Sequence, residues 1–73
     1  MTNDEFAADK GYESKGFSVW YNPKQRKAII YNIKDYRFRL YDNVSMSANG
    51  VFLNTVQEWD HLKTAGCMAD LFN

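Results

Sequence analysis

Three segments of the chain alternate apolar and polar residues, a pattern with a period of two that is typical of β-strands. They cover residues 17–22, 27–33 and 36–42, and Pro23 marks a turn between the first two. The third segment shows the alternation most clearly, with one set of residues apolar and the other largely basic: Tyr36, Phe38 and Leu40 against Arg37, Arg39 and Tyr41. We therefore expect a hairpin followed by a third strand that has one core face and one basic face.

The residues from Gly50 to Leu62 predict a fourth strand that leads into a helix. Residues 51–53 are strand-prone and follow an Asn-Gly turn signal. Thr55 and Glu58 have the spacing of a capping box, which marks a helix N-terminus. Three apolar residues then recur at helical spacing and form one stripe: Val56, Trp59 and Leu62. We expect this helix to end at Gly66 and to cover one face of the sheet.

The predicted fold class is α+β, with a four-stranded antiparallel sheet followed by one C-terminal helix (ββββα). Residues 16–73 are expected to form this single domain. Residues 1–15 contain few apolar side chains, and we expect a tail or a short helix capped by Thr2 or Asn3 and stopped at Gly11.

The composition is that of one small folded domain. With 73 residues, a chain of this kind buries only about 60% of its unfolded surface, so dimerisation is one expected source of further stability. No apolar run approaches the roughly 20 residues of a membrane span, and no signal-peptide pattern is visible. Cys67 is the only cysteine, which excludes an intrachain disulfide. We expect a soluble, intracellular protein.

The net charge of zero conceals a basic middle between acidic ends. Residues 16–39 carry six cations against one carboxylate, or +5, whereas residues 1–15 carry −2 and residues 40–73 carry −3. A basic segment rich in strand signals indicates a surface that can meet a long anion such as a nucleic acid. The alternative is a solvated strand face whose lysines protect a sheet edge.

Binding of single-stranded nucleic acid requires cations for the phosphates and flat rings on which bases stack. Trp20 is the best candidate for an exposed ring, because Phe17, Val19 and Tyr21 alternate with it and suit the buried face. The residues expected to contact nucleic acid are Trp20, Lys24, Arg26, Lys27, Lys34, Arg37 and Arg39.

The sequence gives no support for an enzyme, a metal site or a cofactor. His61 is the only histidine, and together with Cys67 it cannot supply a metal quartet from one chain. No glycine-rich phosphate loop is present. The main alternative to nucleic-acid binding is a small protein-interaction module, an inhibitor or adaptor whose divided charge matches a patch on a partner.

Two blocks of this chain resemble the Positive Cofactor Four family of transcriptional coactivators, whose C-terminal domain binds single-stranded DNA. The first block comprises Gly50-Val51-x-Leu53, Trp59 and Leu62-Lys63, and the second runs from Lys27 through Ile33-Lys34-Asp35-Tyr36. Together with the preceding hairpin they cover roughly residues 17–64.

The resemblance implies a curved four-stranded sheet and a helix that pairs with its equivalent in a homodimer, through Val56, Trp59 and Leu62 here. It also implies basic channels that bind single-stranded DNA. The expected function is binding of single-stranded nucleic acid, DNA or RNA, with little dependence on sequence, in transcription, replication or repair. By position, Lys34 matches the family's basic residue before the acidic-aromatic pair, and Lys24, Arg26 and Lys27 lie near its basic first hairpin. Where the family has a DNA-stacking tryptophan, this chain has Arg37.

Overall fold

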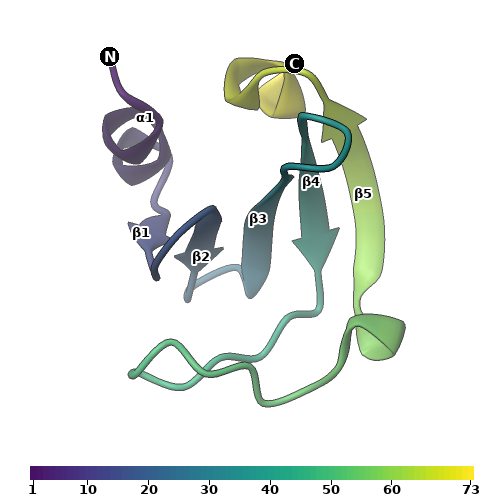
Figure 1. The fold of residues 1–73 in the computed structure, drawn as a ribbon. Helices are drawn as coiled ribbons and strands as arrows, with labels where there is room; N and C mark the ends of the chain where they lie inside the picture. Colours follow the sequence, from purple (N-terminus) through teal and green to yellow (C-terminus); the bar gives the residue numbers. More distant parts are fainter.

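A single sheet of five antiparallel strands organises the chain, and each strand pairs with the one that follows it in the sequence (Figure 1). The structure is a computed structural model that describes residues 1–73. Its elements are helix α1 (Asn3–Asp9), strands β1 (Glu13–Ser14), β2 (Val19–Asn22), β3 (Lys27–Asn32), β4 (Arg37–Asp42) and β5 (Asp60–Ala65), and the 3-10 turns η1 (Val56–Glu58) and η2 (Met68–Phe72). The two chain termini lie at the same end of the sheet (Figure 1).

The prediction of four strands followed by a C-terminal helix is wrong. Residues 51–53 lie in the long connection between β4 and β5, which we call the β4–β5 loop (residues 43–59), and only Phe52 forms an isolated bridge, to Met46. The predicted helix is replaced by one 3-10 turn, η1, followed by strand β5.

The capping box itself is present, but it specifies no more than one turn. The backbone N–H of Thr55 donates to Oε2 of Glu58 at 2.8 Å, as a capping box requires. From Asp60 onward the chain pairs with β4 instead, because an isolated helix of about ten residues is marginal in water and strand pairing satisfies the backbone along the edge of β4. The register of this pairing shifts between Leu40 and Tyr41.

The first fifteen residues pack against the sheet and place two side chains in its core. Thr2 caps α1 by accepting a hydrogen bond from the Glu5 N–H at 3.1 Å, and the Glu5 carboxylate accepts one from the Thr2 N–H at 2.9 Å. Ala7 and Tyr12 are buried, and β1 pairs with β2. This short edge strand was not predicted from the sequence.

Both faces of the sheet are covered, by different parts of the chain. The larger cluster lies under α1 and η2 and is formed by Ala7, Tyr12, Trp20, Ile29, Phe38, Leu40, Ala65, Met68 and Leu71. The smaller cluster lies on the other face, where the β4–β5 loop places Val44 against Tyr21 and Ala28. The Tyr21 hydroxyl donates to the Val44 carbonyl at 2.8 Å, which fixes the loop to the sheet.

Because both faces of the sheet are covered, the side chains of β2 are not buried in the predicted pattern. The sequence predicts that Phe17, Val19 and Tyr21 are buried and that Trp20 is exposed. In the structure Trp20 and Tyr21 are both buried, on opposite faces, and Phe17 is fully exposed in the turn before β2. The prediction failed because it assumed a single buried face.

Candidate nucleic-acid interface

Two turns of the same design join β2 to β3 and β3 to β4. Each has four residues, 23–26 and 33–36, and each follows an asparagine whose Oδ1 accepts a hydrogen bond from a backbone N–H inside the turn. Each also ends in a non-glycine residue with positive φ, Arg26 at 56° and Tyr36 at 58°. This backbone conformation is unfavourable for a bulky side chain.

The two turns lie at opposite ends of the sheet, because they cap opposite ends of β3. The six residues of that strand span about 20 Å. Three of the predicted cations, Lys24, Arg26 and Lys27, therefore lie at one end, and the other three, Lys34, Arg37 and Arg39, lie at the other. The predicted nucleic-acid residues do not form one continuous surface.

The faces of the sheet separate these cations further. Ile30 pairs with Arg39, so the arginines of β4 lie on the face opposite Ile29 and Leu40. Lys27 alternates with Ala28 and so lies on the same face as Ile29. A strand of nucleic acid that follows Arg37 and Arg39 does not meet Lys27.

Trp20 is not an exposed stacking ring. It is only 6% exposed, and its Nε1–H donates to Oδ1 of Asp4 in helix α1 at 2.7 Å. The expectation that Trp20 is an exposed platform for bases is wrong, because α1 covers the face on which it lies.

Asp35 organises the β3–β4 turn electrostatically. Its Oδ1 accepts hydrogen bonds from the backbone N–H of Arg37 at 3.2 Å and from Nη1 of Arg39 at 3.3 Å, and its Oδ2 forms an ion pair with Arg39. The pKa of the Asp35 carboxyl is lowered, mainly because the Arg39 side chain donates hydrogen bonds to it. Arg39 is thus largely neutralised, whereas the side chains of Lys34 and Arg37 form no ion pair.

Replacing Arg39 by alanine is expected to raise the pKa of Asp35 toward its usual value of 3.8. Since the folded-state pKa lies below that value, the pair stabilises the fold above pH 3.8 and this stabilisation disappears as the pH falls through the folded-state pKa. An NMR titration of the Asp35 carboxyl in both proteins measures the change. Equal midpoints in the two proteins would show that Arg39 does not hold this carboxylate.

Tyr36 was missed as a candidate. The alternation in the sequence places it on the apolar face with Phe38, but β4 begins only at Arg37, and Tyr36 is 72% exposed at the last position of the turn. Ile33, at the start of the same turn, is also exposed. The positive φ that turns the Tyr36 ring outward is not readable from the residue type.

The three residues predicted to form a dimer interface, Val56, Trp59 and Leu62, do not lie on one helix. Val56 lies in η1 and Leu62 in β5, and they are 52% and 48% exposed. Trp59 lies between these elements, where its ring is 5.4 Å from that of Tyr41 and 4.7 Å from that of Phe52, and its Nε1–H donates to Asn54 at 3.0 Å. Trp59 therefore holds the β4–β5 loop against the sheet.

None of the helices is long and apolar enough to cross a membrane. No three side chains among His, Cys, Asp and Glu come together in a group suited to a metal ion. His61 lies on β5, where Nε2 is 2.8 Å from the Thr64 hydroxyl, and the Cys67 thiol donates to Asp70 at 3.1 Å.

No family model, curated protein or solved structure matches this chain. The resemblance to Positive Cofactor Four therefore rests on the two blocks of residues alone. The strand-to-helix architecture that it implies is absent, since the first block forms the β4–β5 loop, η1 and part of β5. The second block forms β3 and the β3–β4 turn.

Proposed function

We propose that the protein binds single-stranded nucleic acid, with little dependence on sequence, through the β3–β4 turn and the adjoining start of β4. The observation that carries this proposal is an exposed ring, Tyr36, between two cations that form no ion pair, Lys34 and Arg37. A ring in this position offers a stacking surface to any base, and cations on either side of it attract the flanking phosphates.

The backbone conformation of Tyr36 is unfavourable for an aromatic residue. Its φ of 58° places an aromatic residue where glycine or asparagine is favoured, at a cost of about 1–2 kcal/mol. The exposed ring has no large apolar burial to offset this cost. Arg26 in the β2–β3 turn has nearly the same φ, so the ring rather than the backbone distinguishes Tyr36, and the chemistry of an outward-pointing ring suits base stacking.

The matched turn at the other end of the sheet provides the control. The β2–β3 turn carries Lys24 and Arg26 in the same two positions as Lys34 and Tyr36, with a proline in place of Ile33. It has the same backbone design and carries two cations and no carboxylate, but it has no aromatic ring. Its Arg26 side chain already donates to the Ser45 hydroxyl at 2.6 Å.

The experiment is a salt titration of binding to a short oligothymidine. The double variant Lys34→Ala with Arg37→Ala is expected to bind more weakly, and removing two phosphate contacts should reduce the slope of log K against log salt by about 1.4. Both side chains are exposed, so the thermal midpoint should stay nearly unchanged.

Lys24→Ala with Arg26→Ala is the control variant, and it is expected to leave the slope nearly unchanged at 0.15 M salt, where charges about 20 Å away are screened. Equal loss in the two double variants would contradict a local site and would indicate attraction to the general charge of the protein. No detectable binding at low salt would remove the proposal.

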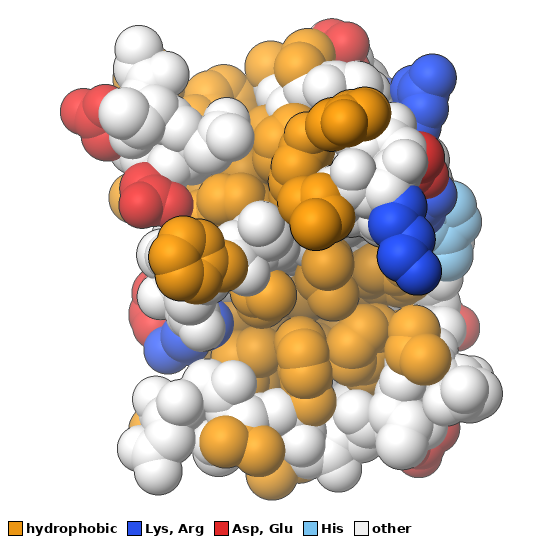
Figure 2. Space-filling model, in the orientation of Figure 1, with side chains coloured by type: hydrophobic (Ala, Val, Ile, Leu, Met, Phe, Trp, Pro, Cys, Tyr) orange, Lys and Arg blue, Asp and Glu red, His pale blue; other side chains and the backbone are white.

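A second candidate function is protein interaction through the β4–β5 loop and the residues after it, where exposed aliphatic side chains accumulate. These residues are Val51, Leu53, Val56 and Leu62. Hydrophobic side chains also gather over the middle of the molecule in Figure 2, with charged side chains toward the edges of that view. The β4–β5 loop contains no cation, so the oligothymidine titration separates this function from the first.

A further inference from the structure

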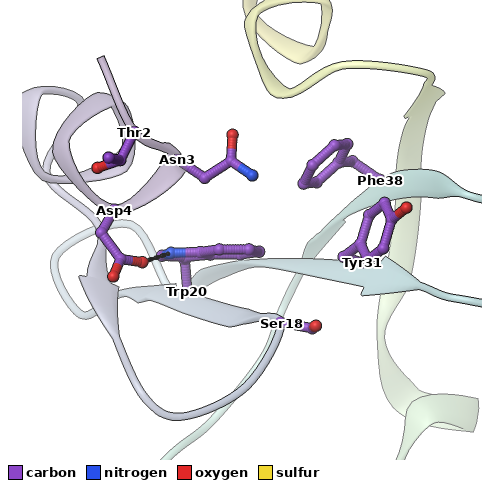
Figure 3. A pocket seen from close by; sticks show the side chains of 7 residues that line it. All are labelled: Thr2, Asn3, Asp4, Ser18, Trp20, Tyr31 and Phe38. Carbon is purple, nitrogen blue, oxygen red and sulfur yellow. Dashed lines mark hydrogen bonds between the residues drawn. The ribbon is translucent and has the colours of Figure 1, made fainter.

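A pocket of about 300 Å³ lies between the start of α1 and the sheet. Three aromatic side chains of β2, β3 and β4 form its inner wall, and the first residues of the chain form its outer wall (Figure 3). The lining residues are Thr2, Asn3, Asp4, Ser18, Trp20, Tyr31 and Phe38. In Figure 3 the Asn3 amide points toward the rings, and the Asp4 carboxylate lies at the outer edge of the Trp20 indole.

The charge of this pocket selects a cation. Aromatic ring faces are electron-rich and attract cations, and the Asp4 carboxylate adds a full negative charge. One carboxylate oxygen accepts the Trp20 Nε1–H at 2.7 Å, and no protein group donates to the other. No lysine, arginine or histidine lines the pocket, so phosphates have no partner there.

The rings are held in place before any ligand arrives. Trp20 and Phe38 are each 6% exposed, so only a small part of either ring reaches the pocket, and their ring centroids are 6.1 Å apart. Tyr31 is half-buried and is the most accessible of the three rings. The Tyr31 and Phe38 centroids are 4.7 Å apart, with the planes inclined at 51°. Walls fixed by the protein core bind a ligand without an ordering cost, which favours affinity.

We propose that this pocket binds an alkylated ammonium group, the trimethylammonium of a modified lysine in a partner peptide. Methyl groups on nitrogen can bury against the rings and spread the positive charge over them. An unmodified lysine has three N–H donors, and it can donate one to the free Asp4 oxygen but finds no acceptor on the rings for the others. The volume reaches the lower limit of typical ligand pockets.

An adjoining pocket explains why the cation is expected on a peptide. This second pocket, of about 390 Å³, shares Asp4, Ser18 and Trp20 with the first and is also lined by Gly16 and the exposed Phe17. It offers room for the residues that flank the modified lysine. A free trimethylammonium compound such as choline would fill only the first pocket. This inference does not depend on nucleic-acid binding at the β3–β4 turn.

The test measures binding of three ligands to the full chain: a short neutral peptide with one trimethyllysine, the same peptide with lysine, and choline. The trimethyllysine peptide is expected to bind on the order of tenfold more tightly than the lysine peptide. It should also bind more tightly than choline and shift the Trp20 Nε1–H signal in NMR spectra.

Equal affinity for the two peptides, or no binding of either at millimolar concentration, would overturn the proposal. If choline binds as tightly as the trimethyllysine peptide, the cation pocket stands but the assignment to a peptide is overturned.

Asp4→Asn tests the charge while keeping an oxygen that can accept the Trp20 hydrogen bond. It should weaken binding of the trimethyllysine peptide by about tenfold, whereas Asp9→Asn, a matched change on the same helix outside the pocket, should not. Tyr31→Ala removes one wall from a half-buried position and is expected to weaken binding as well. Unchanged affinity in Asp4→Asn and Tyr31→Ala, with both proteins folded, contradicts the site.

Discussion

Replacing Ile29 by alanine is expected to lower the free energy of unfolding by about 2–5 kcal/mol. Ile29 is completely buried at the centre of the larger cluster, between Trp20 on β2 and Leu40 on β4. The loss removes buried apolar surface and leaves a cavity that the neighbouring rings cannot fill. A domain of 73 residues has a free energy of unfolding of roughly 4–11 kcal/mol, so this single change removes a large part of its stability. Urea denaturation followed by circular dichroism measures the difference.

Ile33→Ala is the matched control for this prediction. It removes the same atoms from the end of the same hairpin, but Ile33 is 72% exposed, and the expected change is within about 0.5 kcal/mol. If Ile33→Ala lowers the free energy of unfolding as much as Ile29→Ala does, the cost does not come from burial in the core, and the prediction is contradicted.

Tyr36→Gly is expected to make the protein more stable and to weaken its binding of oligothymidine. Glycine adopts the positive φ without the cost of about 1–2 kcal/mol, although its greater freedom in the unfolded chain offsets about 0.5–1 kcal/mol of this gain. Loss of one stacked base costs about 1–3 kcal/mol of binding free energy. This corresponds to an affinity lower by a factor of about 5 to 150. Thermal melting and a binding isotherm at fixed salt measure the two effects.

Arg26→Gly separates the effect of the ring from the effect of the backbone. Arg26 has nearly the same φ in the matched turn, so glycine there relieves a similar cost, less the contribution of the hydrogen bond to Ser45. Its affinity for oligothymidine is expected to change little. If Tyr36→Gly binds as well as the unchanged protein, the ring is not a stacking surface.

The hairpin and the third predicted strand follow from local alternation, and the structure has strands at these places. Lys27–Asn32 and Arg37–Asp42 carry their core residues on the side that the pattern indicates, with Ile29, Phe38 and Leu40 buried. These assignments succeeded because a period of two places whole sets of residues on one face. They failed at the ends, where Ile33 and Tyr36 lie in a turn.

The C-terminal half was not predictable from local signals. The capping box of Thr55 and Glu58 forms as expected, yet the following residues pair with β4. Whether Asp60–Ala65 becomes helix or strand depends on the open edge of β4, which a local pattern does not contain. The burial of Trp20 likewise depends on α1, a helix whose own sequence is too short to predict its docking.

The candidate sites show the same limit. The cations were identified from the sequence, but their division between two ends and two faces of the sheet required the register of β3 and β4. Tyr36 was placed on the wrong side because its backbone conformation is set by the turn. The pocket around Trp20 joins residues 2–4 to three strands, and no spacing in the sequence brings them together.

Backbone NMR during a titration with oligothymidine tests the central claim most directly, because it locates the contact residue by residue. We expect the largest changes in the amide signals at residues 33–37, with small changes at residues 23–27 in the matched turn. Changes centred on the matched turn or on the β4–β5 loop, or no changes at low salt, would contradict binding of single-stranded nucleic acid at the β3–β4 turn.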